Sequence, residues 1–90
     1  METFLVKLKD ERRLKLSATY EFDDNQILNM EVTATSRKNR IQSFLMEKTA
    51  GALDSKNGRM KLKSQIRYIA NEVAFRNPVT DVDVMELVVQ

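Results

Sequence analysis

The N-terminal part of the chain alternates between apolar and polar positions. Residues 3–9 alternate with Leu5 as the exception, and the alternation from Leu14 to Phe22 is strict. A period of two is typical of a strand that buries one face. Only the charged turn Asp10–Arg13 separates the two segments, so the sequence predicts a β-hairpin. Its buried face carries Phe4, Val6 and Leu8 in the first strand and Leu14, Leu16, Ala18, Tyr20 and Phe22 in the second.

The middle of the chain changes to helical spacing. We expect a helix from about Asn25 to Thr49, with N-cap candidates at Asp23–Asn25. The β-prone residues Val32–Thr35 predict a break or a poorly formed turn inside it. The charged run Arg37–Arg40 falls mostly outside the apolar stripe, which consists of Ala34, Ile41, Phe44 and Leu45.

A second helix is predicted after the turn residues Asp54–Gly58. Asp54 or Ser55 can cap it at its start. Pro78 ends it, because Asn77 stands before a proline and is disfavoured in helical angles. The apolar positions of this helix recur at the spacing of one buried face and are Leu62, Ile66, Ile69, Ala70 and Val73.

The last segment, Val79–Gln90, is rich in aliphatic residues and changes phase near Met85. One reading is a β-bulge near Met85, which switches the faces. The other is an interior strand whose second half is covered on both faces. Val82 and Val84 share one face of a regular strand, and the other face carries Met85, Leu87 and Val89.

The order strand, strand, helix, helix, strand predicts an α+β fold. A single terminal strand is not stable alone, so it must join the N-terminal hairpin in one small sheet. We expect two to three helices to pack on one face of that sheet. At 90 residues the chain is expected to form a single domain, residues 1–90.

The composition removes most catalytic chemistry. The chain has no cysteine and no histidine, which excludes disulfides, thiolate sites and the commonest general base. The remaining residues form no recognisable nucleophile, base or metal site, so we expect no enzyme, no cofactor and no metal. A net charge of only +2, and aromatic residues that do not interleave with the basic ones, argue against nucleic acid as a partner.

Three acidic residues of the last segment are the remaining candidates for site chemistry. In a strand, Asp81 and Asp83 would share one face about 7 Å apart, with Glu86 close by. We interpret them as the solvated end of a strand. The alternatives are a paired-carboxylate site or weak binding of a hard cation, but the glycine of an EF-hand loop is absent.

Two groups of basic residues fall on the predicted helices. We interpret both as solvated helix faces, with docking to an acidic protein or an anionic lipid surface as the alternative. Within the second group we predict that Arg59, Lys63 and Arg67 contribute to a partner-binding surface. The groups are Arg37, Lys38 and Arg40, and Arg59, Lys61, Lys63 and Arg67.

A series of short motifs runs through the second half of the chain. They are Leu45 with Lys48 and Thr49, then Leu53, Ser55, Gly58, Arg59, Leu62 and Lys63, then Ile66 and Asn71, and at the end Val79, Asp81, Val82, Val89 and Gln90. In this order they resemble the C-terminal domain of the FliL family of flagellar basal body-associated proteins. The first half agrees more loosely, with Phe4–Leu8 and Leu14–Ser17 at the family's opening strands; Lys7 replaces the usual Asn, and Leu16 stands for Val.

The resemblance implies a fold similar to the core domain of stomatin-like proteins. It implies that the chain is the periplasmic part of a protein anchored in the bacterial inner membrane by a transmembrane helix outside residues 1–90. The implied partners are the flagellar stator, the basal body and further copies in a ring-like homo-oligomer. The implied function is non-enzymatic support of stator recruitment or function, and hence of motility. The alternative is a small cytosolic adaptor that binds an acidic protein or a nucleic-acid surface.

Overall fold

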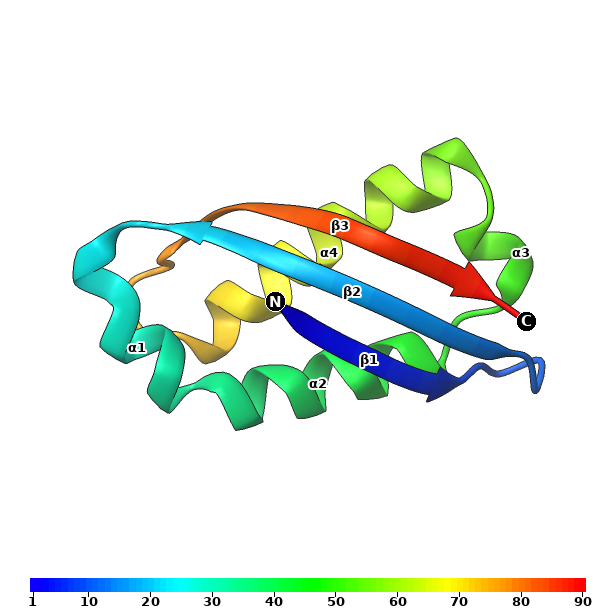
Figure 1. Cartoon of the computed structure of the whole chain (residues 1–90), viewed down its shortest axis with the longest axis horizontal. Helices are drawn as coiled ribbons and strands as arrows, with labels where there is room; N and C mark the ends of the chain where they lie inside the picture. The colour runs from blue at the N-terminus through cyan, green and yellow to red at the C-terminus, as the bar shows by residue number, and fades with distance from the viewer.

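An antiparallel sheet of three strands forms one layer of the computed structural model, which describes residues 1–90. The strands are β1 (Glu2–Lys7), β2 (Arg13–Phe22) and β3 (Val79–Val89), in the order β1-β2-β3. The helices form the second layer on one side of the sheet (Figure 1). The predicted α+β fold, the hairpin and the joining of the terminal strand to it are therefore confirmed, and β2 is the central strand.

The core lies between the sheet and two long helices, α2 (Ala34–Met46) and α4 (Lys56–Val73). The inward face of the hairpin is the one that the alternation predicts, and the two helices bury the predicted stripes against it. The core residues of the strands are Phe4, Val6, Leu14, Leu16, Ala18, Val79 and Val82, and those of α2 and α4 are Ile41, Leu45, Leu62, Ile66, Ile69 and Ala70.

A β-bulge at Met85 explains the change of phase in the last strand. Val84 pairs with Ala18 and Glu86 pairs with Ser17, so Met85 is an extra residue with no partner on β2. The bulge returns the last apolar residues to the core face, where Leu87 lies opposite Leu16 and Val89 opposite Leu14. The first reading is confirmed, and the reading of an interior strand is wrong because β3 is an edge strand.

The first helical region is divided, as the β-prone residues predict. A short 3-10 turn, η1 (Asp24–Gln26), leads into α1 (Ile27–Val32), and Thr33 separates α1 from α2. The Thr33 hydroxyl donates to the carbonyl oxygen of Asn29 at 2.7 Å, inside the helical ladder. The expected side-chain cap at Asp23 does not form.

The second helical region begins with a short helix, α3 (Ala50–Leu53), before α4. Of the two cap candidates for α4, Ser55 makes the bond: its hydroxyl oxygen accepts from the Gly58 N–H at 2.8 Å. A Cβ atom at residue 58 would lie 1.9 Å from the Ala52 carbonyl oxygen, so only glycine allows α3 and α4 to approach this closely.

The side chain of Asn71 ties the start of β3 to α4. Asn71 donates to the Val79 carbonyl oxygen at 2.9 Å and accepts from the Val79 N–H at 2.8 Å. The prediction that Pro78 ends the helix is wrong, because α4 ends five residues earlier at Val73; Asn77 has a φ of 47°, in the left-handed region. These contacts place the start of β3 beside the end of α4.

Candidate functional site

The predicted partner-binding residues line one face of α4. Arg59, Lys63 and Arg67 are four residues apart, so they point to the same side of the helix, next to β3. Arg59 and Lys63 remain open to solvent, with 57% and 43% of their side chains exposed. The structure therefore brings these three side chains together, and we call them the α4 stripe.

Each member of the α4 stripe has a nearby acceptor. A guanidinium nitrogen of Arg59 lies 3.8 Å from the Asp54 carboxylate, and Nζ of Lys63 lies 3.9 Å from Oδ1 of Asp83. Arg67 donates to the carbonyl oxygen of Thr80 at 3.3 Å. Exposed ion pairs of this length contribute at most about 1 kcal/mol each, so these contacts leave the stripe free to exchange its acceptors for those of a partner.

The acidic residues of β3 border the α4 stripe. Asp81 and Asp83 are exposed and lie opposite Glu21 and Thr19 of β2, as the interpretation of a solvated strand end requires. Glu86 is separated from them by the bulge and pairs instead with Lys15 at 3.5 Å. No group of three or more His, Cys, Asp or Glu side chains could hold a metal ion.

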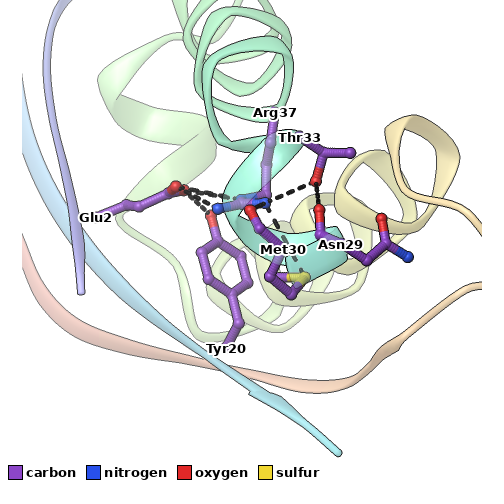
Figure 2. Close-up of polar contacts among 6 residues, drawn as sticks. All are labelled: Glu2, Tyr20, Asn29, Met30, Thr33 and Arg37. Atoms are coloured by element: carbon purple, nitrogen blue, oxygen red, sulfur yellow. Dashed lines mark hydrogen bonds and ion pairs between the residues drawn. The ribbon is translucent and has the colours of Figure 1, made fainter. Parts of the chain in front are cut away.

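The predicted exposure of Arg37 is wrong. Its side chain is only 6% exposed and forms an ion pair with Glu2, with 2.7 Å between Nη2 and Oε2. Nη1 donates to the Met30 carbonyl oxygen at 3.0 Å and to the Thr33 hydroxyl at 3.3 Å. Figure 2 shows the guanidinium between β1 and the break at Thr33 that separates α1 from α2. Arg37 therefore stabilises the packing of these elements and is not part of a solvated basic face.

Tyr20 completes this buried cluster from the central strand. Its hydroxyl donates to Oε1 of Glu2 at 2.6 Å, and the Arg37 guanidinium lies 5.0 Å from the centre of its ring (Figure 2). Burial, and then the hydrogen bond to the Glu2 carboxylate, raise the pKa of Tyr20 well above its ordinary value. Tyr20 thus stays protonated and donates to Glu2 across the ordinary pH range. We call Glu2, Tyr20 and Arg37 the buried triad.

A sequence signal for the buried triad exists in the helical spacing. Arg37 follows Ala34 by three residues and precedes Ile41 by four, so it belongs to the apolar stripe by position. A cation in such a stripe needs a buried anion, but Glu2 lies 35 residues away and nothing local identifies it. The other two residues of that basic group are exposed, and Arg40 pairs with Glu72 of α4 at 2.9 Å.

A second carboxylate anchors the hairpin turn to the helices. Oδ2 of Asp10 accepts from the Ala50 N–H, at the start of α3, at 3.0 Å. This hydrogen bond is the main cause that holds the pKa of Asp10 below its ordinary value. The turn, which the sequence leaves without a defined type, is therefore fixed by a contact to a distant helix.

One comparison with known proteins identifies a family for the chain. The family model for flagellar basal body-associated protein FliL matches residues 1–90, the whole chain. None of the curated proteins compared with the chain matches it. Within these residues, no helix has the length and apolar character that crossing a membrane requires.

Proposed function

The chain belongs to the FliL family of flagellar basal body-associated proteins, and we propose that it is the periplasmic domain of a membrane-anchored protein that supports stator recruitment and motility. The observation that carries the proposal is the match of the family model to residues 1–90. In this proposal residues 1–90 fold as one domain and act by binding, without catalysis. The partners are the stator, the basal body and further copies of the same protein in a ring.

The α4 stripe supports a role in binding. Its cations are exposed, lie on one helix face and are paired only through weak surface contacts. Residues that stabilise the fold have the opposite character, as Arg37 shows by its burial. We therefore assign Arg59, Lys63 and Arg67 to the surface that meets the stator or the basal body.

The test uses the full-length native protein in a flagellated host that lacks the gene. The variant Lys63→Glu/Arg67→Glu should assemble fewer fluorescent stator foci and swim more slowly than wild type. Its matched control is Lys38→Glu/Lys61→Glu, which makes the same change of charge at exposed residues without ion pairs. Normal foci and swimming in the first variant would contradict the assignment of the α4 stripe.

The proposed location has a separate test. The chain contains no cysteine, so Lys38→Cys places a unique thiol within residues 1–90. A thiol reagent that does not cross the inner membrane should label this variant in intact spheroplasts. Labelling only after lysis would place the domain in the cytoplasm and favour the adaptor reading.

A further inference from the structure

The helices leave one face of the sheet open to solvent. Pairing across the strands arranges the outward side chains of this face in rows. One row consists of Leu5, Lys15 and Val88, each in register with the next. The adjacent row contains Lys7 and Arg13, which pair with each other at the same end of the sheet.

A shallow concavity of about 690 Å³ lies over these two rows. Leu5 is 71% exposed and Val88 is 43% exposed, so the floor presents two aliphatic side chains to solvent. Leu5 is also the one residue that interrupts the alternation of the first strand. The rim is formed by charged residues, and the full lining is Leu5, Val6, Lys7, Arg13, Leu14, Lys15, Glu86, Val88 and Gln90.

The charges on the open face are separated along the strands. Lys7 and Arg13 form no ion pair, and Lys15 has only the exposed partner Glu86 at 3.5 Å. The far end of the same face carries acidic residues in the paired positions Glu21 and Asp81, and Asp83, close by, is paired with Lys63 of the α4 stripe. The cations are thus concentrated around the apolar floor, although the net charge of the whole chain is only +2.

We propose that this concavity, which we call the open-face groove, binds an acidic segment of a partner protein, and that one or two apolar side chains of the segment pack against Leu5 and Val88, which lie on either side of Lys15. The apolar floor supplies the contact area, and Lys7, Arg13 and Lys15 supply the matching charge. This inference concerns a surface separate from the α4 stripe and does not depend on the flagellar proposal.

The layout favours a protein segment over a membrane. A flat anionic bilayer that covered the groove would also approach the acidic far end, where Glu21 and Asp81, which form no ion pair, would be repelled. A short segment can occupy the basic end alone, because the lining of the groove does not reach Glu21 and Asp81.

The experiment is an NMR titration of ¹⁵N-labelled chain, residues 1–90, with a capped peptide of alternating Asp and Leu. We expect shift changes concentrated at residues that line the open-face groove, and weaker binding when salt is raised from about 0.02 M to about 0.3 M. Control peptides alternate Lys with Leu, or Asp with Ser. Both should bind more weakly, because one reverses the charge and the other removes the apolar anchors.

Two variants sharpen the titration. Lys15→Glu and Leu5→Ser should each lower the affinity for the Asp–Leu peptide about tenfold. Lys61→Glu, on the exposed face of α4, should bind the peptide with an affinity close to that of wild type. Both target residues are exposed, so the fold should survive, and unchanged shifts of core amides would verify this.

Four results would each overturn the proposal. Shift changes at the α4 stripe and not at the groove would show that the peptide binds elsewhere. Equal affinity for the Asp–Ser and Asp–Leu peptides would show that the apolar side chains do not contribute to binding. Stronger binding of the groove to phosphatidylglycerol vesicles than to the peptide would identify a membrane surface. Concentration-dependent shifts of the groove without peptide would identify a second copy of the chain as the occupant.

Discussion

Arg37 on α2 and Lys63 on α4 are both cations on amphipathic helices that pack against the same sheet. Arg37 is buried, makes a 2.7 Å ion pair with Glu2 and is in contact with three further residues. Lys63 is 43% exposed and reaches its carboxylate only at 3.9 Å. The difference follows from helical phase: Arg37 occupies a position of the apolar stripe, whereas Lys63 lies at the border of the stripe of α4.

This contrast separates charges that build the fold from charges that are available to a partner. A buried cation cannot leave its anion without a large loss of stability, so Arg37 is fixed in place. An exposed cation loses little when it changes partners, so Lys63 and its neighbours can take part in recognition. The following predictions test this separation, from the largest expected effect to the smallest.

Replacing Arg37 should cause the largest loss of stability. Arg37→Met leaves the Glu2 carboxylate without its main partner in a mostly buried position, which should lower the free energy of unfolding by about 3 kcal/mol. Urea unfolding followed by circular dichroism measures this loss. A decrease below about 1 kcal/mol, the range of surface pairs, would remove the distinction between Arg37 and the α4 stripe.

Removing the hydroxyl of Tyr20 should have an intermediate effect. Tyr20→Phe deletes the 2.6 Å hydrogen bond to Glu2 but keeps the ring beside Arg37, and should cost about 1–2 kcal/mol. The same urea measurement applies. If Tyr20→Phe were neutral, the hydroxyl would not contribute to the buried triad.

The buried triad should also make stability depend on alkaline pH. The pKa of Tyr20 is raised in the folded protein, so the native state holds its proton more tightly than the unfolded chain. The contribution is complete below the unfolded pKa of about 10, and stability falls by up to about 1.4 kcal/mol per pH unit above it. The free energies of unfolding of wild type and Tyr20→Phe, measured from about pH 8 to about pH 11 on both sides of that pKa, isolate this dependence. Parallel curves would show that Tyr20 does not cause it.

On the acid side, the dependence should come from Asp10. Its pKa is lowered by the hydrogen bond from the Ala50 N–H, so its contribution is present above the unfolded pKa of about 3.9 and is lost as pH falls. Asp10→Ala should therefore be less stable than wild type at neutral pH, and the difference should shrink in acid. Thermal melts of both proteins at neutral pH and in acid measure this difference in stability. A difference that stays the same at both would contradict the role of the Asp10 carboxylate.

Charge reversal in the α4 stripe should have the smallest effect on stability. Lys63→Glu/Arg67→Glu removes only an exposed pair and one exposed hydrogen bond, so the free energy of unfolding should change by less than about 1 kcal/mol. The urea midpoint provides the measurement. A loss as large as that of Arg37→Met would show that the stripe stabilises the fold and would undermine its role in binding.

Much of the fold could be predicted because its signals are local. The alternation from Leu14 to Phe22 defines β2, the β-prone residues around Thr33 locate the break, and the change of phase at Met85 marks the bulge. The choice between a bulge and an interior strand needed the strand order, which is a property of the whole sheet.

The candidate sites could be predicted only in part. The spacing of Arg59, Lys63 and Arg67 is sufficient to place them on one helix face. The burial of Arg37 depends on Glu2 and Tyr20, which only the folded chain brings to α2. The open-face groove likewise combines residues of all three strands, so no local pattern reveals it.

The most direct test of the separation between buried and exposed cations is a double-mutant cycle of Glu2→Gln and Arg37→Met by urea unfolding. If the two side chains form a buried pair, the losses of the single variants should be strongly non-additive, with a coupling of about 2 kcal/mol or more. Losses that add to within about 0.5 kcal/mol would show that Glu2 and Arg37 act independently, and would contradict the assignment of Arg37 to the fold.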